Sequence, residues 1–153
     1  MPSVAVMLAV SACSDDDSPI TVPTCNTLAD DGPPVTATAV SATAPAPAGG
    51  TIEDGTYELT AMTLYGGTSA DLPPGTVSVV VEVTGSVMQQ VIKINGSAGR
   101  YTTNFTTSGT SISLVDSCPK WTSETHSFSA TPTDHRMYDT GTAGVLEQVY
   151  TKR

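Results

Sequence analysis

The sequence predicts an all-β fold, and three observations support this prediction. Only 14% of the 153 residues are Asp, Glu, Lys or Arg, well below the roughly one quarter that is usual in globular domains. From Gly50 onward, short runs rich in Val, Ile, Thr, Tyr and Phe are separated by Gly, Pro, Asn or Asp. No long segment has a helical period. Because 39% of the residues are hydrophobic, we expect one packed domain.

The chain begins with a short apolar stretch that ends at a cysteine. Residues 4–12 are apolar except for Ser11, and such a run is too short for a hydrocarbon core, which needs about 20 residues. Its length is typical of the apolar region of a signal peptide, although no Lys or Arg precedes it. The four residues that end at Cys13 (VSAC) resemble the lipobox of bacterial lipoproteins, in which a signal peptidase cuts before a lipid-modified cysteine.

This resemblance implies a location as well as a cleavage site. Residues 1–12 would be a signal peptide, and residues 13–24 a tether acylated at Cys13, for example with palmitate. Ser14, rather than an aspartate, follows the cysteine, which favours the outer membrane, with the domain either periplasmic or surface-exposed. The acidic stretch CSDDD is either a surface-export tag or a solvated spacer. The alternative reading is that Cys13 is a free thiol in a short hydrophobic helix.

Residues 25–50 are predicted to form an N-terminal segment that ends in a linker. The stretch CNTLADDGPPV is rich in turn residues, and TATAVSATAPAPAGG contains Ala, Thr and Pro without periodicity. Pro45 and Pro47 disfavour helix, both at their own positions and at the alanines before them. We therefore expect an extended linker, a boundary near Gly49 and Gly50, and a β-barrel domain over residues 51–153.

Eight strands are predicted in this domain, and the residues between them are typical of tight hairpin turns. Asn95-Gly96 is the strongest turn signal, because a type I′ turn needs positive φ at both central positions. Alternating residues favour half-buried strands, as in Val77, Val79, Val81 and Val83. The expected strands are 56–65, 76–84, 86–94, 100–107, 111–118, 124–131, 135–139 and 145–152.

An eight-stranded antiparallel up-and-down barrel is the favoured arrangement of these strands. A closed barrel removes exposed edges and leaves an interior wide enough for side chains or one small ligand. Most connections are short hairpins, whereas a Greek key needs a long return connection. A two-sheet β-sandwich built from the same strands is the alternative.

Cys25 and Cys118 are expected to form a disulfide if the protein is exported. Export places the chain in an oxidising compartment, and lipidation would already occupy Cys13. The sequence contains no CxxC and no Cys/His ligand set. A bond between them would close a loop of about 90 residues, which the chain-entropy model values at about 4 to 5 kcal/mol, and would pin the N-terminal segment to the barrel.

Three longer stretches resemble a known group of proteins. GGTIEDGTYELTAMTLYGG, CNTLADDGPPV and LEQVYTKR resemble segments of uncharacterised bacterial lipoproteins of the myxobacterial type. The barrels of that group are similar to the lipocalin-like or calycin architecture. The resemblance implies a fold and a location, and it implies no activity.

Residues that could carry chemistry are few. His126 and His135 lie on different predicted strands, with Asp134 and Arg136 near the second, and a metal site or an acid/base pair could be built there. His135 follows a Pro-Thr-Asp turn, so we expect it to be solvated. No nucleophile lies in a strand-turn-helix elbow, and we expect no catalytic residues, metal or cofactor. Trp121 is expected to plug a barrel end.

The net charge of −9 limits the partners. No Lys or Arg precedes Lys93, so the chain offers little to neutralise phosphates and nucleic acid is not expected. Three non-enzymatic functions stay open: a lipid-anchored envelope protein that binds a small apolar ligand in its barrel, an interaction or inhibitor module whose acidic surface meets a cationic protein, and a structural surface lipoprotein. A barrel filled with apolar side chains would weigh against the first.

Overall fold

The computed structural model describes residues 24–120 and 122–153, which form an all-β domain. Strands β2 to β9 pair antiparallel in chain order, and β2 also pairs with β9, so the sheet closes into an eight-stranded barrel. A ninth strand, β1, pairs parallel to β2. The strands are β1 (Thr38–Val40), β2 (Gly55–Tyr65), β3 (Val77–Thr84), β4 (Val87–Ile94), β5 (Ser97–Ser108), β6 (Ser111–Cys118), β7 (Ser123–Ala130), β8 (Asp134–Gly141) and β9 (Gly144–Lys152), and η1 (Ser69–Asp71) is a short 3-10 helix.

The barrel confirms the predicted fold class, and its topology excludes the sandwich. Each of the eight predicted runs coincides with one strand, although β5 begins at Ser97 rather than at residue 100. Asn95 and Gly96 have φ values of 50° and 89°, as the turn prediction requires. The architecture is consistent with a lipocalin-like fold. Within the described residues, no helix is long and apolar enough to cross a membrane.

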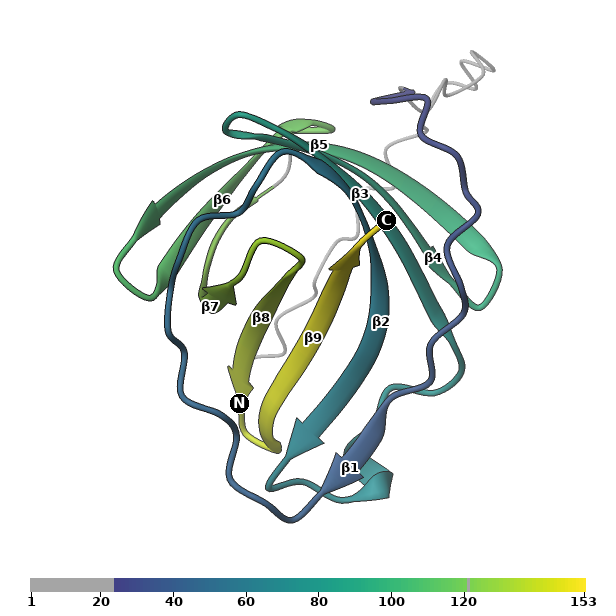
Figure 1. Cartoon of the computed structure of the whole chain (residues 1–153). Helices are drawn as coiled ribbons and strands as arrows, with labels where there is room; N and C mark the ends of the chain where they lie inside the picture. The colour runs from purple at the N-terminus through teal and green to yellow at the C-terminus, as the bar shows by residue number, and fades with distance from the viewer. Residues whose placement is uncertain (1–23, 121) are drawn as a thin grey trace, which may run out of the picture.

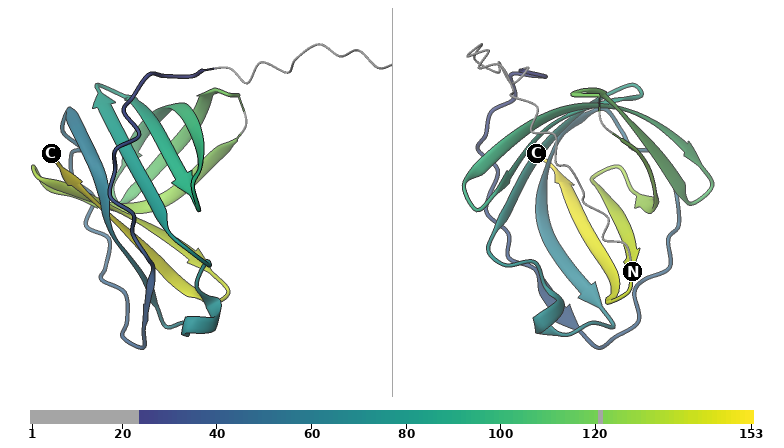
Figure 2. Two further views of the ribbon diagram at one scale, coloured as in Figure 1. Left: turned by 90° about the vertical axis from the view of Figure 1, so that its right-hand side faces the viewer. Right: turned by 180° about the vertical axis from the view of Figure 1, so that it is seen from behind.

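The barrel is tight at one end and splayed at the other. β2 pairs with β3 only over Gly55–Glu58, and β7 pairs with β8 only over Ser127–Ala130. Beyond these ladders the wing formed by β3 to β7 diverges from the wing formed by β8, β9 and β2, as Figures 1 and 2 show. We call the paired end the closed end and the other the open end. Several of the fully buried side chains lie around the closed-end ladders, among them Tyr57, Val83, Met88, Phe128 and His135.

The segment predicted as a linker is extended, but it packs against the barrel instead of standing apart from it. β1 pairs with Thr63–Tyr65 of β2, and the Val35 N–H donates to the Val77 carbonyl at 2.8 Å. Residues 35–40 therefore fill the gap between β2 and β3 at the open end, and Ala37 joins the core. The sequence did not indicate this strand, because a three-residue strand is too short to show a period.

The rest of this segment closes the barrel on another side. From β1 the chain loops round to the start of β2 (Figure 1). On the way the Gly49 N–H donates to the Phe128 carbonyl at 2.9 Å, and the Ala130 N–H donates to the Gly49 carbonyl at 2.7 Å. Ile52 then enters the core. Residues on both sides of Gly49 and Gly50 therefore pack against the barrel.

Candidate functional site

The inner face of the barrel changes character from the closed end to the open end. Side chains alternate between the two faces of a strand, so those in register with the core residues face inward. At the closed end the inward side chains are mainly apolar and aromatic. Toward the open end polar side chains join the apolar ones at the inward positions, and they are Gln90, Tyr101, Thr103, Asp116, Glu124, His126, Asp139 and Gln148.

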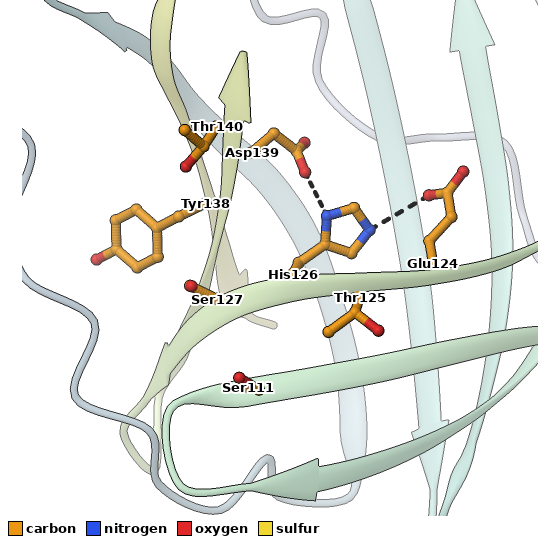
Figure 3. Close-up of a pocket in the computed structure, with 8 residues that line it drawn as sticks. All are labelled: Ser111, Glu124, Thr125, His126, Ser127, Tyr138, Asp139 and Thr140. Atoms are coloured by element: carbon orange, nitrogen blue, oxygen red, sulfur yellow. Dashed lines mark hydrogen bonds and ion pairs between the residues drawn. The ribbon is translucent and has the colours of Figure 1, made fainter.

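Three of these polar side chains form an array across the gap between β7 and β8. The Nε2 atom of His126 lies 3.2 Å from a carboxylate oxygen of Glu124, and its Nδ1 atom contacts the carboxylate of Asp139. Figure 3 shows the imidazole between the two carboxylates. Because both carboxylates are acceptors, only a doubly protonated imidazolium can donate to both. The array therefore ties the two wings together where their backbones have parted.

Three hollows meet at this array. The first, which we call the seam groove, lies between β7 and β8, has a volume of about 450 Å³ and contains Glu124, His126 and Asp139. The second hollow, about 290 Å³, lies on the β3 to β7 wing and shares Glu124. The third hollow, about 240 Å³, lies on the opposite wing and shares Asp139. We call the second and third hollows the mouth hollows.

The walls of the mouth hollows combine apolar side chains with acceptors. Ile92 and Leu114 line the hollow on the β3 to β7 wing together with Asp116. Leu64 and Leu146 line the hollow on the facing wing. Among the described residues, no Lys or Arg lines the seam groove or either mouth hollow. The site is therefore amphipathic and negatively charged.

Most basic side chains of the barrel are engaged elsewhere. Lys93 pairs with Asp30 at 2.8 Å, and Arg153 pairs with Asp31 at 2.9 Å. These two pairs fasten the N-terminal segment to the barrel, and a bond of 2.7 Å from Arg100 to the Leu28 carbonyl does the same. Arg136 pairs with Glu147 at 3.0 Å. The carboxylates of the open end instead accept from neutral side chains and His126: Gln148 donates to Asp139 at 3.0 Å, and Thr103 donates to Asp116 at 2.7 Å.

The array does not have the geometry of a nucleophilic triad. In such a triad the second imidazole nitrogen faces a hydroxyl or thiol, whereas Nε2 of His126 faces Glu124. Nor does any group of three or more His, Cys, Asp and Glu side chains in the described part of the chain form a metal-binding set. The arrangement supplies fixed negative charge beside apolar walls, which suits binding.

The two histidines are not brought together. His135 lies opposite Ala130 in the closed-end ladder and is 1% exposed, so the prediction that it is solvated was wrong. Its ring stacks on Tyr150 and meets Tyr57 edge-on, both at 4.8 Å between centroids. Burial lowers the pKa of His135 from 6.5 to about 4. β8 begins at Asp134, one residue earlier than predicted, and the period of the strand directs His135 inward.

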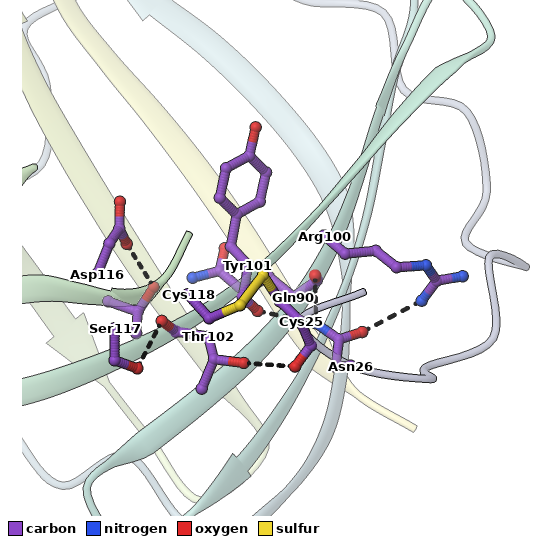
Figure 4. Close-up of a disulfide and its surroundings, with 10 residues drawn as sticks. Cys25, Asn26, Gln90, Arg100, Tyr101, Thr102, Asp116, Ser117 and Cys118 are labelled. Carbon is purple, nitrogen blue, oxygen red and sulfur yellow. Dashed lines mark hydrogen bonds between the residues drawn. A yellow bond between two sulfur atoms is a disulfide. The ribbon is translucent and has the colours of Figure 1, made fainter. Parts of the chain in front are cut away.

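Cys25 and Cys118 form the predicted disulfide, which holds the start of the N-terminal segment beside β5 and β6. Figure 4 shows the polar bonds around it. The side-chain amide of Asn26 donates to the carbonyls of Gln90 and Tyr101 at 2.9 and 2.8 Å, and Thr102 donates to the Cys25 carbonyl at 3.0 Å. Asn26 thus reinforces the attachment that the disulfide makes.

The remaining predicted residues, Cys13 and Trp121, lie outside the described residues. The sequence did not indicate Glu124 and Asp139 as partners of His126, although both lie at inward positions of predicted strands. Glu124 and His126 lie on β7 and Asp139 lies on β8, and these two strands do not pair at the open end, so no backbone ladder there aligns the three residues.

Comparisons with protein-family models, curated proteins and solved structures find no match.

Proposed function

We propose that this chain is a non-enzymatic binding protein of the bacterial cell envelope, held at the outer membrane by a lipid on Cys13, and that its barrel mouth takes a small ligand. One observation carries the binding proposal. Core side chains fill the closed end, while the open end retains two facing hollows of about 290 and 240 Å³. Concave, mostly apolar sites with a few converging polar groups are typical of small-molecule binding.

The walls indicate what kind of ligand fits. Leu114 on one wing and Leu146 on the other provide apolar contact, and Glu124 and Asp139 border the space between them. A ligand with an apolar body and a hydrogen-bond donor or positive charge would match both features. A fully apolar ligand would remove water from Glu124 and Asp139 without offering them a donor in addition to His126, and desolvation of a charged group is costly.

Two further observations support the non-enzymatic and anchored parts of the proposal. Nε2 of His126 faces a carboxylate rather than a nucleophile. The disulfide uses Cys25 and Cys118, which leaves Cys13 as the remaining cysteine of the chain, in a stretch that resembles a lipobox. The resemblance to myxobacterial-type lipoproteins agrees with this location.

Ligand binding can be tested with the full chain carrying Cys13→Ala, which can be studied without detergent. The probe is the neutral fluorophore N-phenyl-1-naphthylamine, which has an apolar body and an N–H donor. We expect saturable 1:1 binding that weakens at least tenfold in Leu114→Trp, because the indole fills the hollow. Val115→Trp is the matched control, since Val115 is the next residue and is 49% exposed on the outer face. Absence of saturable binding, or equal affinity in both variants, would refute the proposal.

Anchoring is tested separately, in cells. Metabolic labelling with an alkynyl palmitate analogue should label the wild-type protein and leave Cys13→Ala unlabelled and released from the membrane fraction. An unlabelled wild-type protein, or a Cys13→Ala variant that stays membrane-bound, would contradict the lipid anchor without bearing on the barrel mouth.

A further inference from the structure

We propose that the seam groove binds an extended, basic segment of a partner protein, which pairs with β7 as an added strand. This site adjoins the mouth hollows of the proposed function and shares Glu124 and Asp139 with them. It lies where Ser123–His126 of β7 and Asp139–Gly141 of β8 diverge. In the described structure these stretches pair with β6 and β9 respectively and not with each other. Each strand therefore presents an edge to the groove.

The backbone of β7 has donors and acceptors aimed into this groove. The Phe128 N–H donates to the Thr110 carbonyl, and the Phe128 carbonyl accepts from Gly49, so the peptide groups of Phe128 point toward the β6 side. Peptide groups alternate in direction along a strand. Those of Thr125, an odd number of residues away, consequently point to the opposite side, where the groove lies. Thr125 is exposed, so an incoming strand can reach its N–H and carbonyl.

The opposite seam of the same barrel already holds an added strand. β2 and β3 diverge at the open end just as β7 and β8 do, and β1 fills that gap through backbone pairing with Thr63–Tyr65. Val35 extends the pairing to Val77. This barrel therefore accommodates an extended segment between two diverging strands. Addition of a strand to an exposed sheet edge is a general mode of peptide recognition.

The charge of the seam groove and the size of the side chains that line it indicate what kind of segment it would bind. The floor of the groove carries Glu124 and Asp139 on either side of His126, and no Lys or Arg lines it. The walls next to β7 are the small hydroxyl side chains Ser111 and Ser127, which allow a backbone to approach closely. A segment with a Lys or Arg at the position that faces the floor would pair with these carboxylates.

The test uses the full-length Cys13→Ala protein and fluorescence anisotropy with a labelled peptide, Lys-Thr-Val-Lys-Thr-Val-Lys. We expect saturable binding, and at least tenfold weaker binding to Thr125→Pro, which lacks the N–H that faces the groove. Thr125→Val, which keeps that N–H, is the matched control and should bind as the parent does. The double variant Glu124→Gln, Asp139→Asn should bind at least fivefold more weakly.

Two peptide controls keep the test decisive even if Thr125→Pro fails to fold. A peptide methylated at alternate backbone nitrogens should lose at least tenfold in affinity for the unaltered groove, and a peptide with Glu in place of Lys should not bind. Equal binding of the methylated or the Glu peptide would overturn the proposal. Leu114→Trp should leave peptide binding unchanged, and loss of peptide binding in that variant would place the peptide in the mouth and also overturn it.

Discussion

Nδ1 of His126 on β7 contacts the carboxylate of Asp139 on β8 across a gap in which the backbones of the two strands no longer pair. The same ring reaches Glu124 through Nε2. One imidazole thus connects the two wings of the barrel and the two carboxylates that border its hollows. These three side chains therefore contribute both to the geometry of the open end and to its charge.

The first prediction concerns the Cys25–Cys118 bond, whose partners are separated by 93 positions. We expect the double variant Cys25→Ser, Cys118→Ser to lose about 4 to 5 kcal/mol of unfolding free energy, because the unfolded chain regains the entropy of a long loop. Urea unfolding measures this loss. Wild-type protein unfolded in the presence of a reductant is the control and should match the variant. An unchanged midpoint in both would contradict the prediction.

The second prediction is that His135 makes stability depend on pH. Burial holds its pKa in the folded protein near 4, against 6.5 in an unfolded chain, and nearby Asp134 opposes this shift in part. Between these values the unfolded state binds a proton that the folded state does not. The contribution to stability is therefore fully present above pH 6.5 and is lost as the pH falls toward 4, by about 3 kcal/mol in total.

Unfolding free energies measured between pH 7 and pH 4 test this pH dependence. In His135→Phe, which keeps an aromatic ring between Tyr57 and Tyr150, the slope should decrease by close to one proton over this range. The wild type and His135→Phe both keep His126, so its contacts with Glu124 and Asp139 do not differ between the two proteins. A pH profile of His135→Phe that overlays the wild type would show that His135 is not the responsible group.

The third prediction concerns the buried carboxylate of Glu147, which is 3% exposed. It accepts hydrogen bonds from Arg136 and from the Tyr65 hydroxyl, both at 3.0 Å. Arg136→Met removes the only cation paired with Glu147 in the described structure, and we expect a loss of about 3 kcal/mol in urea unfolding. Adding Glu147→Gln should recover most of it, because a neutral amide is cheaper to bury. A double variant no more stable than Arg136→Met would contradict this account.

The strands and hairpins could be predicted because their signals are local. Asn95-Gly96 specifies a turn through its own φ angles, and alternating valines such as Val79 and Val81 identify the inner face of β3 without knowledge of any other strand. Closure of β2 on β9 followed from counting strands and from the need to remove edges. The pairing of Cys25 with Cys118 followed from cysteine number and the inferred compartment.

The candidate site could not be predicted, because it depends on where the backbone pairing between neighbouring strands ends. Nothing local in β7 indicates that pairing with β8 ends at Ser127, yet that ending creates the groove and brings His126 to Asp139. The same applies to β1. Its three residues form a strand because they pair with Thr63–Tyr65 of β2, and not because of their own β propensity. The turn before His135 suggested that its side chain is exposed. The side chain is buried because His135 occupies an inward position of β8.

The fourth prediction compares two glycines to test whether the N-terminal segment is an integral part of the fold. Gly49 and Gly85 have positive φ values of 67° and 58°. An added Cβ at Gly49 would overlap the Gly109 carbonyl, whereas at Gly85 it would meet nothing within 4 Å. Gly85→Ala should therefore cost only the backbone strain, about 1 kcal/mol.

Gly49→Ala should cost at least about 2 kcal/mol, because backbone strain is joined by a clash with the Gly109 carbonyl that is relieved by moving the segment away from the turn between β5 and β6. That movement would break the hydrogen bonds of Gly49 to Phe128 and Ala130. Urea unfolding gives the two free energies, and amide hydrogen exchange should show lower protection at Ala130 in Gly49→Ala alone. If both variants lost the same stability and kept the same protection, the segment would contribute nothing to the barrel through this contact.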